Sequence, residues 1–255
     1  MFNLLNIRNS KRGYSIFDTK APSPLIPLRR RGKLCAFTLA EVLITLVIIG
    51  VIAAITVPTL ITKYQKEQTV TRLKKAYSAL AQTTQRAIAD NGPIETWEIG
   101  NAKIFFNKYI NPYVSLSKKA EWLNDGNWNS EFYNLNGVQE NYSNSYARAY
   151  FTDGTSVTLG VNSNNDTNKI LILKIDINGD KKPNKQGKDI FEYIYYILTP
   201  KINYLGKLIP SGQEYSRDII ISNLGPWNCN KEKTGAYCAT LIMKDGWQIA
   251  DDYPW

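Results

Sequence analysis

Glu41 is the residue whose type and position most clearly point to chemistry. It is the only charged residue in the apolar stretch 37–61, FTLAEVLITLVIIGVIAAITVPTLI. An ionised carboxylate in hydrocarbon costs about 2.5 kcal/mol or more, so we expect a compensating partner. A cut between Ala36 and Phe37 would supply one, because Phe37 would then carry a charged amine and Glu41 would lie in the first helical turn, where the helix dipole favours an anion. The amine of a neighbouring copy could pair with Glu41 and set the register between copies.

Glu41 stands at the start of a long predicted helix. Residues 37–61 are long enough to cross a bilayer, which takes about 20 apolar residues. Residues 62–90 then carry an amphipathic stripe at helical spacing, from Leu73 to Ile88. The sequence Asn-Gly-Pro at 91–93 is a stop signal. We therefore predict one continuous helix from about residue 37 to 90, roughly 80 Å long. Its first half would lie in a membrane and its second half would hold a globular domain.

The distribution of charge predicts how this helix is oriented. Residues 1–36 hold eight Lys or Arg residues and one acid, Asp18, so this leader carries +7 of the net charge of +9. Basic residues concentrate on the cytoplasmic side of membrane helices, so we expect a cytoplasmic leader and an extracytoplasmic domain, in an inner membrane. The rest of the chain holds 23 basic and 21 acidic residues. That balance gives no case for specific binding of nucleic acid.

The segment Lys33–Ile44, KLCAFTLAEVLI, resembles the amino-terminal segment of type IV prepilins and type II secretion pseudopilins. Basic residues precede a small residue, Phe comes next, and Glu is the fifth residue after the cut. Pro58 lies where that family carries a helix proline, and Gly50 precedes it by eight residues. The family usually has Gly at the position of Ala36, so we expect cleavage here to be slower.

The resemblance implies a processing and assembly pathway. A membrane prepilin peptidase would cut after Ala36 and methylate the amine of Phe37, and Glu41 would guide the addition of subunits. The helix between Gly50 and Pro58 would loosen in the filament. The partners would be the peptidase, other pilin or pseudopilin subunits and the assembly machinery. The function implied is that of a structural subunit in a type IV pilus or a type II secretion pseudopilus.

The part of the chain after the helix predicts an extracytoplasmic α+β domain, residues 93–255. Helical patterns are expected at 103–110 and 117–123. Strand patterns follow at 147–152, 155–161, 169–177 and 189–198, with a hairpin turn at Asp153-Gly154, and short strands are expected at 239–243 and 247–250. The expected fold is pilin-like, with a long amino-terminal helix on a small antiparallel sheet. Its expected parts are a cleaved leader 1–36, an assembly half 37–61, an amphipathic half 62–92 and the domain.

Histidine is absent from the sequence, which excludes Ser-His-Asp and Cys-His catalysis and zinc sites that need His. We expect a structural protein and not an enzyme. The rival classes are a membrane-anchored enzyme that works with carboxylates and an anchored carbohydrate-binding module with exposed aromatic rings, and neither explains Glu41 or the leader. Cys229 and Cys238 remain as an even pair once the leader, with Cys35, is removed. In an oxidising compartment this favours a disulfide, with two free thiols as the alternative.

A further segment, residues 176–189, carries oxygen-bearing side chains at alternating positions. Asp176, Asn178 and Asp180 could face one hard cation, and Asp189 could close the site. The loop is not an EF-hand, because Lys181 stands where an EF-hand needs Gly and Gly187 stands where it needs an acid. Some pseudopilins carry calcium in a loop between strands, so the resemblance implies calcium here. The residues alone favour an Asx-rich connecting loop.

Overall fold

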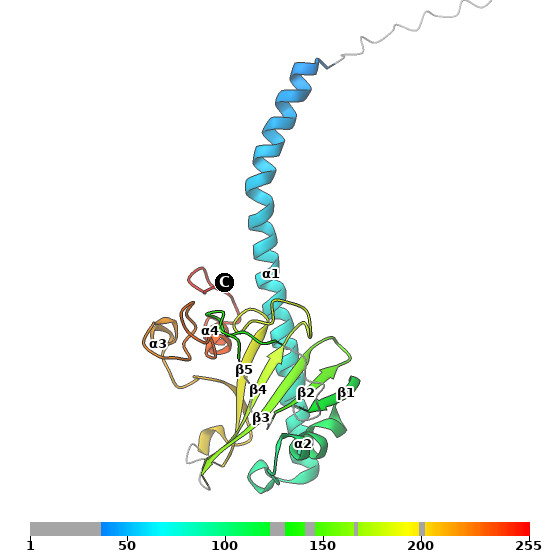
Figure 1. Cartoon of the computed structure of the whole chain (residues 1–255), viewed down its shortest axis with the longest axis vertical. Helices are drawn as coiled ribbons and strands as arrows, with labels where there is room; N and C mark the ends of the chain where they lie inside the picture. Colours follow the sequence, from blue (N-terminus) through cyan, green and yellow to red (C-terminus); the bar gives the residue numbers. More distant parts are fainter. Residues whose placement is uncertain (1–36, 123–130, 141–145, 166–167, 199–201) are drawn as a thin grey trace, which may run out of the picture. The chain divides into compact units, whose positions relative to one another are not determined.

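The structure is a computed structural model that describes residues 37–122, 131–140, 146–165, 168–198 and 202–255 (Figure 1). The predicted leader, residues 1–36, and Ala36 with it, lie outside the described residues. The chain divides into two compact units, one that ends at Ile52 and one that runs from Ala53 to Trp255. The architecture is α+β, with a long apolar amino-terminal helix and an antiparallel sheet.

Helix α1, Leu39–Asn91, is the long helix that the sequence predicts. It ends where expected, because Gly92 adopts a φ of +81°, a left-handed conformation that glycine reaches without strain. The backbone N–H of Gly92 donates to the carbonyl oxygen of Ile88 at 2.9 Å, and Pro93 then cannot continue the helix.

The described strands form one antiparallel sheet in the unit that starts at Ala53. They pair in chain order, as a meander, and their bounds are β1 Leu116–Trp122, β2 Tyr146–Phe151, β3 Ser156–Asn165, β4 Asn168–Asp176, β5 Ile190–Leu198 and β6 Leu208–Pro210. Strands β2 to β5 confirm the four longer strand predictions. The predicted hairpin joins β2 to β3, where Gly154 has a φ of +86° and Phe151 donates its N–H to the Thr155 carbonyl oxygen at 2.9 Å.

One face of the sheet packs against the second half of α1. The side chains that β4 and β5 bury on this face are Leu171, Leu173, Ile175, Phe191, Tyr193, Tyr195 and Ile197. The predicted stripe of α1 meets them, with Leu73 and Leu80 buried and the Tyr77 ring stacked on the Tyr193 ring at a centroid distance of 5.4 Å. The hydroxyl of Tyr195 bonds to that of Thr84. The amphipathic half of α1 is therefore a core element of the domain, as expected.

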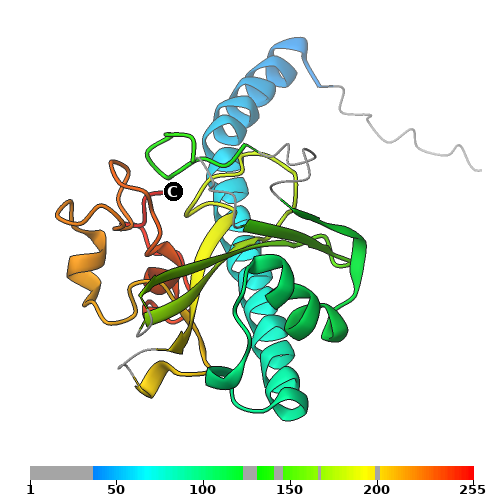
Figure 2. The same cartoon turned by 60° about the horizontal axis from the view of Figure 1, so that its bottom comes forward.

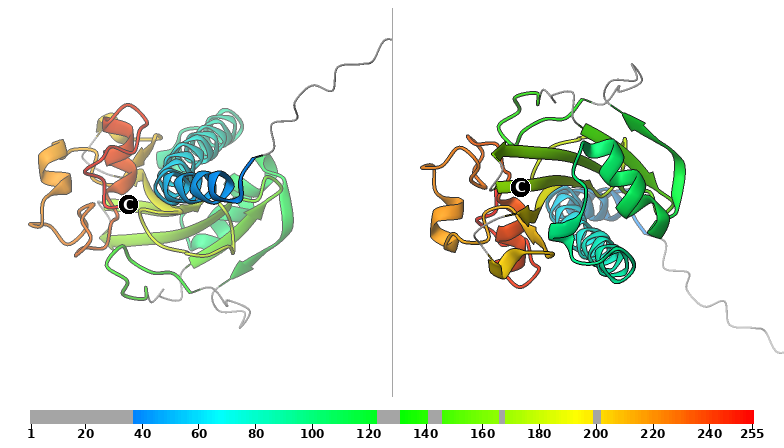
Figure 3. Two further views of the ribbon diagram at one scale, coloured as in Figure 1. Left: turned by 90° about the horizontal axis from the view of Figure 1, so that it is seen from above. Right: turned by 90° about the horizontal axis from the view of Figure 1, so that it is seen from below.

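The opposite face of the sheet carries the polar side chains of Arg148, Lys174 and Glu192 beside apolar ones such as Ile172 and Ile194. Figure 3 shows the segment 131–140 on this side of the sheet, away from α1. Arg148 on β2 is fully buried there, with Nη2 3.1 Å from Ser156 Oγ and 3.3 Å from Asp176 Oδ2. Its guanidinium carbon lies 4.6 Å from the centroid of the Phe132 ring. Phe132 belongs to the segment 131–140, so Arg148 ties that segment to the sheet.

The remaining helices are short, and they lie toward both sides of the sheet (Figure 2). They are η1 Ile94–Thr96, α2 Ala102–Phe105, η2 Phe106–Ile110, η3 Asn111–Tyr113, η5 Ile202–Tyr204, α3 Arg217–Ile221 and α4 Cys238–Lys244. Helices α2 and η2 confirm the helix predicted at 103–110. Strand β6 and helix α3 were not predicted.

Three predictions of secondary structure are wrong. Residues 117–122 of the helix predicted at 117–123 form most of edge strand β1, because the segment pairs with β2, with Leu116 opposite Phe151. Lysines in this segment suit an exposed sheet edge as well as a helix. Residues 239–243, predicted as a strand, lie in α4, where Thr240 and its neighbours on both sides are all buried. The segment 247–250, also predicted as a strand, is not one in the structure.

Candidate functional site

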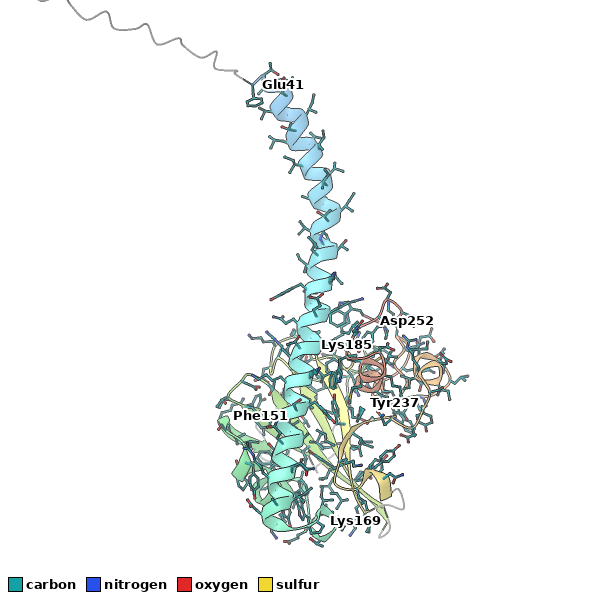
Figure 4. The ribbon with its side chains drawn as sticks, turned by 180° about the vertical axis from the view of Figure 1, so that it is seen from behind. Glu41, Phe151, Lys169, Lys185, Tyr237 and Asp252 are labelled. Atoms are coloured by element: carbon teal, nitrogen blue, oxygen red, sulfur yellow. A yellow bond between two sulfur atoms is a disulfide. The ribbon has the colours of Figure 1, made fainter. Side chains whose placement is uncertain are left out.

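The carboxylate of Glu41 caps the start of α1 (Figure 4). Glu41 Oε2 accepts the backbone N–H of Thr38 at 2.8 Å and the Thr38 hydroxyl at 2.9 Å, and Thr38 Oγ1 accepts the Glu41 N–H at 3.2 Å. This reciprocal pattern is a capping box, which satisfies two backbone N–H groups that the first helical turn leaves free. The position of Glu41 in the first turn is as predicted. The part played by Thr38 was not expected, although the spacing T-x-x-E is its sequence signal.

The predicted cleavage position lies immediately before this cap. Phe37 is 83% exposed and precedes the helix, which begins at Leu39. A chain that began at Phe37 would keep both Thr38 and Glu41. The cut would therefore leave the capping box intact and place a new amine one residue ahead of it.

The helix that follows the cap has an apolar surface on every side. All side chains of residues 37–61 are exposed except that of Ala53, which is half-buried. The most apolar stretch of α1 has a mean hydropathy of 2.6, and none of it is buried. By length and composition α1 is the one helix in the described part of the chain that could cross a membrane, which is compatible with a single-pass membrane anchor.

Gly50 and Pro58 differ in what they do to this helix. A Cβ at Gly50 would meet no atom within 4 Å, so packing within a single chain does not require glycine there. Pro58 has no N–H, so one carbonyl of the preceding turn loses its helical partner. The hydroxyls of Thr59 and Thr62 donate to the carbonyl oxygens of Ile55 and Pro58 at 3.1 and 3.0 Å. Bonds of this kind, from a threonine hydroxyl to the carbonyl oxygen four residues earlier, favour a slight bend of the helix.

Residues 59–255 match a protein family described as "Family of unknown function (DUF6613)". The chain belongs to this family. The match begins directly after Pro58, so DUF6613 covers the globular domain and the amphipathic half of α1 and leaves residues 37–58 of the apolar segment outside. No curated protein and no solved structure is significantly similar to the chain.

Within the DUF6613 region, Cys229 and Cys238 form the predicted disulfide. Both cysteines are buried, and Cys238 is the first residue of α4. A Cβ at Gly187 would lie 2.8 Å from the Cys238 sulfur, so the bridge packs directly on the loop that precedes β5. The disulfide therefore fixes the segment 229–238 against the sheet domain.

The residues predicted to bind calcium lie at the end of β4 and in the loop before β5: Asp176, Asn178, Asp180 and Asp189. Their carboxylates bond to protein groups. Asp180 Oδ1 accepts the Tyr150 hydroxyl at 2.9 Å, and Asp189 Oδ1 accepts the backbone N–H of Lys185 at 2.6 Å. Burial raises the pKa of Asp176, and the carboxylate of Asp189 adds to the rise, against the opposing effects of a backbone hydrogen bond from Asn178 and of Arg148. Across the described ranges, no group of three or more Asp, Glu or Cys side chains is arranged to hold a metal. Calcium binding stays a prediction.

Proposed function

We propose that this DUF6613 protein is a prepilin-type subunit. It is cut between Ala36 and Phe37, held in the membrane by residues 37–61, and polymerised through α1 into a type IV pilus or a type II secretion pseudopilus. It acts as a structural element and not as an enzyme.

The observation that carries this proposal is the contrast between the two halves of α1. The second half is buried against the sheet on one stripe, whereas the first half buries nothing along its apolar length. An apolar surface on all sides needs lipid or other helices around it. In a filament, the helices of many copies would cover one another and the domains would lie outside them.

Glu41 would determine the register in which neighbouring copies of the helix pair. In the single chain its carboxylate is held in place by Thr38, at the end of the helix where an anion is favoured. The charged amine of Phe37 from the next copy would approach the same carboxylate in a water-poor bundle. A mispaired register would leave a charge without a partner in hydrocarbon, which is costly.

The charge of the leader and the disulfide of the domain support an extracytoplasmic location for the domain. The leader carries the basic residues that mark the cytoplasmic side. The Cys229–Cys238 disulfide belongs to the domain beyond the membrane helix, where oxidising conditions preserve such bridges. The partners on this proposal are a prepilin peptidase, further subunits and the inner-membrane assembly machinery.

Processing is the first test. The full chain is produced with and without a prepilin peptidase, and its intact mass and amino terminus are determined. We expect a mature chain that begins at N-methylated Phe37 only when the peptidase is present, and faster cutting of the Ala36→Gly variant. A chain that keeps residues 1–36 in every case, including the Ala36→Gly variant, would contradict the proposal and leave a plain membrane anchor.

Assembly is tested separately with a matched pair of substitutions on α1. Glu41→Gln removes the carboxylate of the capping box, whereas Glu67→Gln removes an exposed carboxylate from the same helix. We expect Glu41→Gln to be processed but not incorporated into filaments, and Glu67→Gln to be incorporated normally. Equal incorporation of both variants would refute the role proposed for Glu41.

A further inference from the structure

An open pocket of about 230 Å³ lies on the sheet face opposite α1. Its floor is formed by Lys174 of β4 and Glu192 of β5, which are opposite one another in the strand register. Its walls are Tyr146 of β2, Glu140 of the 131–140 segment and Trp227 of the carboxy-terminal segment. Five stretches of chain therefore converge on one small polar space, which plays no part in the proposed filament.

The charged groups of the pocket are held in fixed positions. Lys174 has only 4% of its side chain exposed and forms ion pairs with Glu140 and, at 3.8 Å, with Glu192. The other carboxylate oxygen of Glu192 accepts the Ser211 hydroxyl at 2.7 Å. Such a network costs desolvation energy and is already organised before any ligand arrives. Two carboxylates and one ammonium give the pocket a net charge of −1.

The Tyr146 hydroxyl adds a hydrogen-bond donor to these groups. Burial and the nearby carboxylates of Glu140 and Glu192 raise the pKa of Tyr146 to about 12, so the phenol keeps its proton at neutral pH. The Tyr146 ring lies over Gly160, where a Cβ would come within 2.2 Å of a ring carbon. Glycine at this position is what allows the ring to lie against the sheet.

Trp227 supplies an exposed aromatic surface at the rim of the pocket. Its side chain is 55% exposed, yet its backbone is held firmly, because the Trp227 carbonyl oxygen accepts the N–H of Tyr237 at 3.0 Å. The next residue, Asn228, donates its side-chain amide to the Ile219 carbonyl oxygen at 2.6 Å, and the disulfide follows at Cys229. The centroid of the Tyr237 ring lies 6.3 Å from that of the Trp227 ring. An exposed but rigid tryptophan is typical of a binding surface.

We propose that this pocket binds one pyranose unit of a neutral or amino-bearing glycan. The apolar C–H face of the sugar would stack on the Trp227 ring, and its hydroxyls would bond to the carboxylates, the ammonium and the phenol. The volume, below the roughly 300–1,000 Å³ of pockets for drug-sized ligands, suits a single ring. The net charge of −1 repels uronic and sialic acids. The proposal goes beyond filament assembly and does not depend on cleavage at Ala36.

Binding is tested with the full, uncut chain in lipid nanodiscs. The probes are immobilised oligosaccharides of gluco, galacto and manno configuration, each in neutral, amino and uronic acid forms, and the best binder is then titrated by calorimetry. We expect a neutral or amino form to bind and the uronic acid of the same configuration to bind at least about tenfold more weakly. Trp227→Ala should weaken binding about tenfold, because it removes a stacking surface worth about 1.4 kcal/mol.

Two variants separate recognition from folding. Leu224→Ala removes an 88% exposed side chain from the same segment outside the pocket and should leave affinity unchanged. Trp227→Phe keeps an aromatic face and should retain most of the affinity.

A third variant tests the charge of the pocket. Glu140→Gln removes one negative charge and should reduce the discrimination against uronic acids. The proposal is overturned if no saccharide binds up to about 10 mM, if Trp227→Ala binds like the wild type, or if the uronic acid forms bind as tightly as the neutral and amino forms.

Discussion

The contact between Tyr195 and Thr84 offers a quantitative test of how α1 is held on the sheet. Tyr195 is 1% exposed and Thr84 is 2% exposed. The Thr84 hydroxyl donates to the Leu80 carbonyl oxygen at 3.0 Å, so it accepts the Tyr195 hydroxyl proton. The Tyr195 hydroxyl also lies 3.4 Å from the Leu80 carbonyl oxygen. Burial raises the pKa of Tyr195, so its hydroxyl keeps its proton. The perturbation is a double-mutant cycle with Tyr195→Phe and Thr84→Val.

The structure sets the expected size of each effect. Tyr195→Phe removes a buried hydrogen bond but leaves Thr84 bonded to Leu80, so we expect a loss of about 1 kcal/mol in the free energy of unfolding. Thr84→Val leaves the Tyr195 hydroxyl with only the longer bond to the carbonyl, so we expect a loss of about 1–3 kcal/mol. In the double variant no donor is left unpaired, and the two losses should fall short of additivity by about 1 kcal/mol.

The assay is guanidinium unfolding of the full chain in detergent, followed by tryptophan fluorescence. All six tryptophans lie after α1 in the sequence, so the signal reports the domain and not the apolar segment. Tyr64→Phe is the matched control, because Tyr64 is 64% exposed on the same helix and should change stability by less than about 0.5 kcal/mol. Strict additivity of the two substitutions would refute the reasoning.

Three further predictions concern the domain. Reducing the Cys229–Cys238 bridge, whose cysteines are nine residues apart, should lower the free energy of unfolding by about 2–3 kcal/mol, measured by denaturation with and without reductant. Gly160→Ala should displace the Tyr146 ring that covers this position. The displacement should change the near-ultraviolet circular dichroism spectrum and leave the far-ultraviolet spectrum nearly unchanged. Hydrogen bonding to Arg217 lowers the pKa of Asp252 from its ordinary value of 3.8. The contact therefore stabilises the fold at pH values above 3.8, and this stabilisation is lost as the pH falls through the lowered pKa. Acid should therefore lower the amide protection factors of the last residues of the wild type, with the intrinsic pH dependence of exchange divided out, and Arg217→Gln should show no such pH step.

The pattern of hydrophobic residues predicts most of the contacts that hold α1 on the sheet. Its stripe from Leu73 to Ala87 is buried at the expected spacing, because a helix on a sheet needs one apolar face. The strands β2 to β5 were predictable for the same reason. Local patterns failed where tertiary contacts decide the conformation. The segment 117–122 has helix-forming residues but is a strand because β2 pairs with it. The segment 239–243 has strand-forming residues but lies in α4, which begins at the disulfide-bonded Cys238.

The two candidate sites differ in how far the sequence could predict them. The cap of α1 lies within four residues, and the spacing of Thr38 and Glu41 is enough to signal it. The pocket around Lys174 draws on residues from 134 to 236, which only the strand register and the disulfide-bonded segment bring together. A single sequence contains no signal for such a meeting, because each residue alone looks like an ordinary surface group.

The polar face of the sheet also constrains how the strands can align. Arg148, Thr158, Lys174 and Glu192 lie opposite one another across β2 to β5. If β4 slipped by one residue, Lys174 would take the place of Leu173 and face α1. An ammonium in that apolar layer costs several kcal/mol. This row of polar and charged side chains therefore makes misaligned sheets unstable, and it protects the domain against strand mispairing while it folds.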